Sequence, residues 1–124
     1  MKHVLVIDDE QYITRLLARV LAKAGYKTTV AGDGKEGVQR FREDPADVVI
    51  VDIFMPDMDG LEVIRELRKD FPQARFIAIS GGGQMGMPDF LPTARKLGAQ
   101  HILQKPIKNE KLLQTIKEVL SPQT

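Results

Sequence analysis

The residues of this sequence that could do chemistry stand at or just after the ends of short apolar segments. They are three acids, a hydroxyl and an amine: Asp8, Asp9, Asp52, Ser80 and Lys105. Three carboxylates lying close together would repel one another and raise one another's pKa values unless a cation lay among them. An all-oxygen set suits a hard ion such as Mg²⁺, which proteins commonly hold with one or two carboxylates and several waters.

The amine and the hydroxyl add a second possibility, which is phosphoryl chemistry. A hard cation, an ammonium group and a hydroxyl around a free carboxylate suit a phosphoryl group, whose charge spreads over its oxygens. A carboxylate nucleophile would then form an aspartyl phosphate. Asp52 is the best candidate for the nucleophile, because it lies between the acid pair and the Ser80–Lys105 pair in the expected order of strands.

Strands and helices alternate along the chain and would bring these residues together. Short apolar runs rich in β-branched residues are typical of strands buried on both faces of a parallel sheet. We expect strands at Val4–Ile7, Thr28–Ala31, Val48–Val51, Phe76–Ile79 and His101–Leu103. With a helix after each strand, they predict an α/β fold, a (βα)5 three-layer sandwich that forms one domain over residues 1–124.

Helical periodicity and capping residues mark the segments between the strands. The apolar stripe of the first helix ends at Gly25 and comprises Ile13, Leu16, Leu17, Val20, Leu21 and Ala24. Asp33 and Glu36 have the spacing of a capping box at the start of the second helix. Asn109 is expected to cap the last helix, which Pro122 ends.

The segment after the fourth strand is the least regular. We place a helix loosely from Asp89 or Leu91 to Leu97, with Gly98 closing it. The glycine-rich residues 81–87 before it are expected to form a mobile loop that becomes ordered when Ser80 gains a phosphoryl oxygen.

Topology predicts where the chemical residues meet. Right-handed crossovers place the first and third strands side by side at the centre of the sheet, in the order 2-1-3-4-5. Ligands of such sheets bind outside the carboxyl ends of the strands, where the strand order reverses. Asp8, Asp9 and Asp52 would therefore meet at one edge, with Ser80 and Lys105 beside them.

Composition excludes several other classes of function. The 124 residues include no cysteine, which removes disulfides and thiolate catalysis, and the two histidines form no metal-binding motif. Lys+Arg number 18 against 17 Asp+Glu, and this near balance argues against direct nucleic-acid binding. The N-terminus lacks the pattern of a signal peptide, and no apolar run approaches the roughly 18 residues of a membrane helix. We therefore expect a cytoplasmic protein that does not bind membranes.

Four segments, in this order, resemble the response-regulator receiver domains of two-component signalling. They are VLVIDDE, VVIVDIFMPDMDG, FIAIS and LQKP, and the resemblance covers essentially the whole chain. It implies a flavodoxin-like doubly wound sheet and a signalling switch, not an enzyme, that catalyses only its own phosphorylation and dephosphorylation. A sensor histidine kinase or a phosphotransfer protein would be the donor. A downstream protein would bind the fourth helix, the fifth strand and the fifth helix, and a phosphorylation-dependent dimer remains an open alternative.

The resemblance also assigns the acidic residues. Asp52 would be the phosphoacceptor, and Asp8 and Asp9 would be the acidic pair that binds Mg²⁺. The Asp52 carboxylate and the backbone carbonyl of Phe54 would be further ligands of the metal.

The same resemblance places two residues on the phosphoryl group and reveals one departure. Ser80 would hold a phosphoryl oxygen, and Lys105, followed by a cis bond to Pro106, would bridge to the phosphoryl group. The family often has Tyr or Phe three residues before the lysine, as the aromatic half of a switch, but here Ile102 stands there. An aliphatic side chain has no ring to swing inward, and neighbouring His101 points to the other face if this segment is a strand.

Several of the acids also have plain structural interpretations. Asp8 and Asp9 could start the first helix, where acids are favoured, although one acid would suffice for that. Asp57 and Asp59 are better explained as turn or cap residues than as ligands. Glu10 is near enough to reach the pocket, but we expect it at the solvated start of a helix.

Three other functions fit the same fold. A Mg²⁺-dependent phosphohydrolase of the haloacid-dehalogenase type needs a second acid two residues after its nucleophile, where Phe54 stands. A flavodoxin-like cofactor binder needs a phosphate cradle after the first strand, where Asp8, Asp9 and Glu10 would repel a phosphate. A receiver that folds but takes no phosphate is the least expected, because all five site residues are present.

Overall fold

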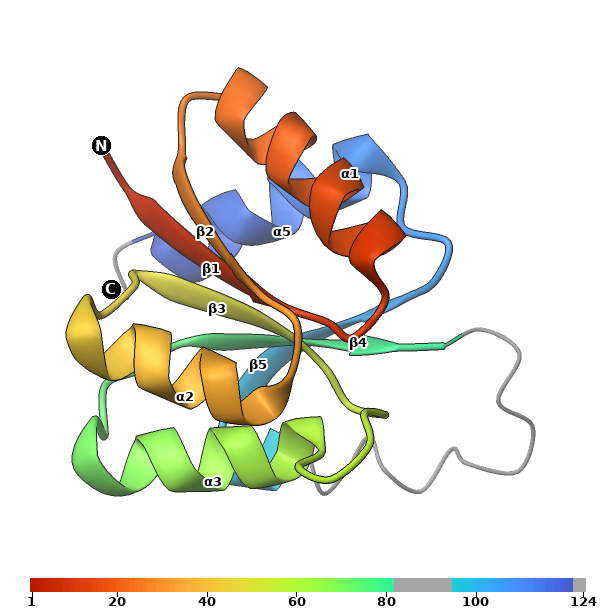
Figure 1. The fold of residues 1–124 in the computed structure, drawn as a ribbon. Helices are drawn as coiled ribbons and strands as arrows, with labels where there is room; N and C mark the ends of the chain where they lie inside the picture. Colours follow the sequence, from red (N-terminus) through yellow and green to blue (C-terminus); the bar gives the residue numbers. More distant parts are fainter. Residues whose placement is uncertain (82–94, 122–124) are drawn as a thin grey trace.

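The computed structural model describes residues 1–81 and 95–121, which form a sheet covered by helices on both faces (Figure 1). Its strands are β1 (His3–Ile7), β2 (Lys27–Ala31), β3 (Val48–Asp52), β4 (Phe76–Ser80) and β5 (Ala99–Gln104). They lie in the order β2-β1-β3-β4-β5, and every neighbouring pair is parallel. The fold class and the strand order predicted from the sequence are therefore confirmed.

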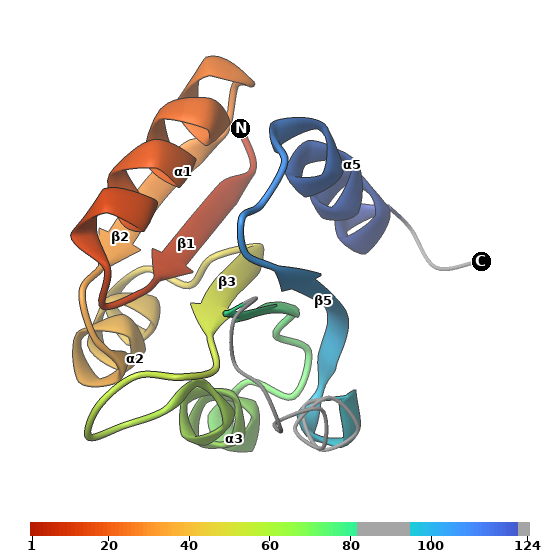
Figure 2. The same cartoon turned by 90° about the vertical axis from the view of Figure 1, so that its right-hand side faces the viewer.

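Four helices of the described chain divide between the two faces of the sheet. One face is covered by α1 (Gln11–Lys23) and α5 (Asn109–Leu120), and the other by α2 (Gly34–Glu43) and α3 (Gly60–Asp70) (Figures 1 and 2). None of these four has the length and apolar character needed to cross a bilayer. Residues 95–97 form a further helical turn that ends at Gly98, where φ is 124°. The rest of the predicted fourth helix, and all but residue 81 of the loop predicted before it, lie outside the described residues.

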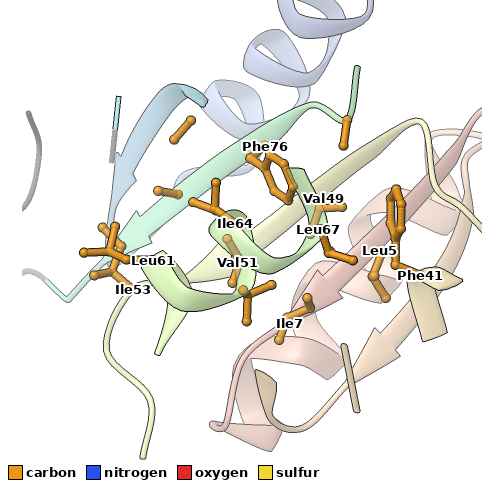
Figure 3. Close-up of a cluster of buried hydrophobic side chains, with 14 of the residues drawn as sticks. Leu5, Ile7, Phe41, Val49, Val51, Ile53, Leu61, Ile64, Leu67 and Phe76 are labelled. Carbon is orange, nitrogen blue, oxygen red and sulfur yellow. The ribbon is translucent and has the colours of Figure 1, made fainter. Parts of the chain in front are cut away.

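Two apolar clusters, one on each face of the sheet, hold the layers together. In β1, Val4 and Val6 belong to the cluster under α1 and α5, whereas Leu5 and Ile7 belong to the cluster under α2 and α3. Figure 3 shows the second cluster, in which side chains of α3 such as Leu67 lie over the central strands. Because both faces of β1 are buried, its residues 4–7 are all apolar rather than alternating with polar ones.

The buried face of α1 differs from the predicted stripe. Leu16 was expected in the core, but it is 37% exposed, and Thr14 is buried instead. The Thr14 hydroxyl donates to the carbonyl of Gln11 at 2.9 Å, so that burial leaves it with a hydrogen bond. Thr14, Leu17 and Leu21 share one face of the helix, and Leu16 points about 100° away from Leu17.

The helix caps confirm two predictions and correct a third. Asp33 and Asp59 each accept a hydrogen bond from the backbone N–H three residues further on, at 2.7 and 2.9 Å. The prediction for Asn109 is wrong, because α5 begins one residue earlier: Lys108 is its N-cap and makes no side-chain cap bond. Asp57, expected in a turn, has a left-handed backbone with φ of 68°.

Candidate functional site

Asp8 and Asp52 lie side by side at the carboxyl edge of the sheet. Ile7 of β1 is in register with Val51 of β3, and the two acids are the next residues on these adjacent strands. Both are almost completely buried, with 0% of Asp8 and 3% of Asp52 exposed. The predicted meeting of residues 44 positions apart in sequence thus follows from the pairing of the two central strands.

The next two strands bring Ser80 and Lys105 to the same edge. Asp52 is in register with Ile79, so that Ser80 follows one position beyond it on the neighbouring strand. Lys105 comes directly after β5, and its backbone N–H donates to the carbonyl of Ser80 at 2.9 Å. Its bond to Pro106 is cis, as the resemblance implied.

The ammonium group of Lys105 lies among three carboxylates. Its Nζ is 2.6 Å from Oε1 of Glu10, 3.1 Å from Oδ2 of Asp8 and 3.1 Å from Oδ2 of Asp52. The Lys105 side chain is 14% exposed, so these charges interact where water screens them only in part. Three carboxylates around one ammonium leave the pocket with an excess of negative charge when all are ionised.

The excess of negative charge affects Asp8 most, because its carboxylate is the most buried of the three. Burial raises its pKa to about 6; the backbone N–H of Glu10, which donates to Oδ1 at 2.9 Å, opposes the rise, and the charge of Asp52 adds to it. Lys105 lowers the pKa of Asp8 again, but its contact with Oδ2 lacks the geometry of a hydrogen bond. The buried Oδ2 atom therefore lies in an ion pair without a hydrogen-bond donor.

Lys105 is held firmly in its charged form. Burial alone would lower its pKa, but the hydrogen bonds to Glu10 and Asp52 and the ion pair with Asp8 outweigh burial and raise the pKa above its ordinary value. Throughout the range in which proteins work, this side chain is thus a fixed positive charge beside the Asp52 carboxylate.

The donor set fits a hard divalent cation. Oxygens of Asp8, Glu10 and Asp52 all lie within 4.8 Å of one another, and they form a carboxylate cluster of the described residues. The buried Oδ2 atom of Asp8 needs a partner, and a metal ion would supply one. Asp9 is exposed and does not belong to this cluster, so that its part in metal binding stays a prediction. The Phe54 N–H donates to Oδ1 of Asp52 at 3.0 Å, which places the residue beside the acid.

Glu10 is the site residue that sequence reasoning assigned elsewhere. It does stand at the exposed start of α1, as expected, but its carboxylate contacts Lys105, 95 positions away. One feature of the sequence could have indicated this contact. Glu10 directly follows Asp8 and Asp9, at the edge of the sheet where the expected Lys105 would need counterions.

Comparison with known proteins agrees with this geometry. The sequence model of the family described as "Response regulator receiver domain" matches residues 4–117. The chain is 35% identical over 121 residues to the chemotaxis protein CheY of Thermotoga maritima, a match that covers 95% of this chain and 97% of that protein. It is 30% identical over 119 residues to the CheY of Bacillus subtilis, covering 95% and 97% of the two chains.

Solved structures give the same result. A response regulator receiver domain protein from Clostridium thermocellum superimposes with a TM-score of 0.88 at 32% identity, covering 97% of this chain and 94% of that one. The CheX–CheY complex with BeF3 and Mg²⁺ from Borrelia burgdorferi also gives 0.88, at 27% identity and with 98% and 90% covered. The chain belongs to the response-regulator receiver domain family, and it is a phosphorylation-dependent switch of two-component signalling.

Proposed function

We propose that Asp52 is the phosphoacceptor of this switch and that the surrounding side chains make it reactive. The observation that carries the proposal is the position of its Oδ2 atom, buried at the carboxyl edge of the sheet and 3.1 Å from the Lys105 ammonium. A carboxylate has no proton to remove before it attacks phosphorus, so that positioning and charge neutralisation are the main requirements.

The transfer step needs little from the protein beyond this geometry. A carboxylate oxygen of Asp52 forms a bond to phosphorus while the bond from phosphorus to the donor's imidazole nitrogen breaks, and the departing imidazole takes up a proton. The fixed positive charge of Lys105 would neutralise a phosphoryl oxygen, and the Ser80 hydroxyl would donate a hydrogen bond to another. Dephosphorylation reverses the state when water attacks the same phosphorus.

Mg²⁺ is the cofactor that we propose for this pocket. Asp8 and Asp52 would hold it, with Asp9 and the backbone carbonyl of Phe54 completing the protein's ligands. When bound, it would supply positive charge to the phosphoryl oxygens. Two observations support this assignment: the buried Oδ2 atom of Asp8 has no hydrogen-bond donor, and the pocket has an excess of negative charge.

Turnover of a separate substrate is not favoured. A phosphohydrolase with an aspartyl nucleophile would need an acid at position 54. This chain has Phe54 there, whose backbone N–H donates a hydrogen bond to Asp52. We therefore propose that residues 1–124 work as one receiver domain in the cytoplasm, whose only catalysis is its own phosphorylation and dephosphorylation.

The partners that we propose are a histidine kinase or phosphotransfer protein as donor and a downstream protein as reader. The reader's surface would lie beside the site, where a shallow cavity of about 680 Å³ runs along the end of β5 and the start of α5. Arg95, Lys108 and Lys111 line this cavity, and Ile102 and Ile107 contribute apolar surface to it. Cations around apolar surface suit a protein segment that carries acidic and apolar side chains.

A mass measurement tests the assignment of Asp52. The protein is incubated with Mg²⁺ and a small phosphodonor such as acetyl phosphate, and its intact mass is followed with time. We expect the wild type to gain one phosphate, and we expect a chelator to prevent the gain. Lys105→Ala should gain it much more slowly, because the positive charge beside the attacked phosphorus is lost.

Matched substitutions locate the modified residue. Asp52→Asn should gain no phosphate, whereas Asp44→Asn, which alters an exposed carboxylate at the end of α2, should behave as the wild type does. One phosphate gained by Asp52→Asn at the wild-type rate would show that another residue is the acceptor.

A further inference from the structure

Glu10 has no part in the proposed phosphoryl transfer, yet it makes the shortest contact of Lys105. It is the N-cap residue of α1, but its side chain makes no cap hydrogen bond, and the first turn of this helix contains no acid. Instead, Oε1 of Glu10 lies 2.6 Å from Nζ of Lys105, closer than the oxygens of Asp8 and Asp52 at 3.1 Å. An N-cap gains most from the short side chains of Ser, Thr, Asp or Asn, so that α1 gains little from glutamate here.

The three acids around Lys105 differ in exposure, and this difference separates their roles. The side chain of Glu10 is 59% exposed, against 0% for Asp8 and 4% for Asp52. The buried pair therefore contacts the ammonium from within the protein, whereas Glu10 contacts it from the solvent side. If the contact with Lys105 breaks, water can solvate the exposed carboxylate of Glu10. Water cannot reach the buried carboxylates of Asp8 and Asp52 in the same way.

The ammonium group of Lys105 is already occupied by anionic partners: it donates hydrogen bonds to Glu10 and Asp52 and forms an ion pair with Asp8. Lysine has three N–H donors and no acceptor, and three carboxylates already lie within 3.1 Å of this one. A phosphoryl group on Asp52 brings new anionic oxygens that compete for the same donors. Among the three carboxylates, Glu10 loses its contact with Lys105 at the lowest free-energy cost, because it alone is exposed enough for water to replace the ammonium group.

We propose that Glu10 is a positioning residue that holds Lys105 in the unphosphorylated chain and releases it to the phosphoryl group. This inference rests on the proposed role of Asp52 and deepens it. The contact between Glu10 and Lys105 stabilises the unphosphorylated state and so opposes phosphorylation of Asp52. Loss of the contact should favour that state by roughly two- to fivefold, the range that a partly exposed ion pair contributes.

Two substitutions separate the contact from the charge of Glu10. Glu10→Gln removes the charge and leaves only a neutral acceptor for Lys105, and Glu10→Asp keeps the charge but is one methylene shorter, so that both lose the ion pair at 2.6 Å. Affinity for beryllofluoride, used as a phosphoryl mimic at saturating Mg²⁺, is measured for each variant. We expect both variants to bind it roughly two- to fivefold more tightly than the wild type. A wild-type affinity in Glu10→Asp, or weaker binding in either variant, would overturn the proposal.

A readout in the metal-free protein tests the contact directly. The ¹H–¹⁵N resonance of the Lys105 ammonium group should shift in Glu10→Gln and in Glu10→Asp, because its hydrogen bond to a carboxylate at this position is lost. Glu43→Gln, at the exposed end of α2, is the control and should change neither the resonance nor the affinity. An unshifted resonance in the two Glu10 variants contradicts the proposal. If the wild type binds beryllofluoride and only the Glu10 effects are missing, the proposed function of Asp52 stands and this inference alone fails.

Discussion

The pocket holds more acid than its single lysine can neutralise, and Asp8 is where this matters most. Its pKa, raised by burial to about 6, means that the folded protein binds a proton at Asp8 more readily than the unfolded chain does, where the ordinary value is 3.8. The ionised carboxylate therefore destabilises the fold above about pH 6, and this penalty disappears as the pH falls towards 3.8. A site that is costly to keep charged is typical of functional rather than structural acids.

Asp8→Asn should therefore stabilise the metal-free protein at neutral pH. Asparagine keeps the shape and can still accept from the Glu10 N–H, but it carries no buried charge. Since one pKa unit corresponds to about 1.4 kcal/mol, we expect the free energy of unfolding to rise by about 1–3 kcal/mol near pH 7.5. The gain should vanish near pH 4, and urea unfolding with a chelator present at the two pH values measures it.

Asp44→Asn is the control for this prediction, because the pKa of Asp44 is shifted in the opposite direction to that of Asp8. The hydrogen bond from Lys27, at 2.7 Å, lowers the pKa of Asp44, so that its ionised form stabilises the fold above the ordinary pKa and the effect is lost on acidification. This variant should not be more stable than the wild type near pH 7.5. An equal gain in both variants would mean that general charge repulsion, not burial, acts on Asp8.

Residue types and positions predicted most of the site, but not every contact within it. Asp8, Asp52 and Ser80 were found because each ends an apolar run, and Lys105 because it follows the fifth strand; strand pairing then fixes where they lie. The contact of Glu10 with Lys105 depends on the direction of a flexible side chain at a helix start, which no periodicity encodes.

A glycine allows the loop between β3 and α3 to lie against Asp52, the proposed phosphoacceptor. Gly60 begins α3, and its N–H donates to the carbonyl of Ile53 at 2.9 Å. A Cβ atom at this position would lie 2.7 Å from the Cα of Ile53 and 2.9 Å from the carbonyl carbon of Asp52. Both are backbone atoms, which cannot turn aside as the end of a side chain can. The glycine thus links the start of an element to the geometry of the site.

Gly60→Ala should harm both stability and phosphorylation. The added methyl group forces the helix start away from the end of β3, at a cost of about 1–3 kcal/mol in the free energy of unfolding. Because the shift falls on the Asp52 backbone, the rate of phosphate gain with a small phosphodonor should fall as well. Gly32→Ala is the matched control, since its Cβ would find only the flexible end of Glu36, at 3.7 Å. Equal stability and equal rates in the two variants would show that the close approach is not restrictive.

At the level of elements, periodicity predicted which segments are strands and helices better than which helical residues are buried. In β1 and β3 every residue is buried, because helices cover both faces of the sheet. The burial of these strands therefore did not depend on predicting which face a side chain points to. In α1, Leu16 and Leu17 are both apolar, but Leu17 shares the buried face with Thr14, whose hydroxyl can be buried because it donates to a backbone carbonyl. The N-cap position of α5 at Lys108 rather than Asn109 depends on backbone geometry, which capping preferences do not fix to a single residue.

Over the whole molecule, β5 connects the site to both faces of the sheet. Ile102 packs against the cluster under α2 and α3, while the ring of His101 lies 3.9 Å from Glu118 of α5. The two residues therefore point to opposite faces, as the sequence predicted for a strand. Ile102 stands where the resemblance led us to expect an aromatic ring, so that β5 contacts the cluster under α2 and α3 through an aliphatic side chain at this position.

Occupation of the acidic pocket should be visible in the stability of the whole fold. A ligand that binds only the folded state stabilises it by an amount set by its concentration, about 2.7 kcal/mol at a hundred times the dissociation constant. We therefore expect Mg²⁺ to raise the midpoint of thermal unfolding of the wild type near pH 7.5, above the effect of sodium chloride at matched ionic strength. Asp52→Asn should lose this response, whereas Asp44→Asn should keep it.

The pH dependence of that response identifies the ligand. Mg²⁺ must displace the proton that Asp8 retains below a pKa of about 6, so that the stabilisation should fade as the pH falls through this value. In Asp8→Asn, the remaining Mg²⁺ response should be weak and should no longer fade near pH 6, because the group that titrates there is gone. A Mg²⁺ response of wild-type size in Asp8→Asn would place the ion away from the buried carboxylates, and the excess charge of the pocket would then need another explanation.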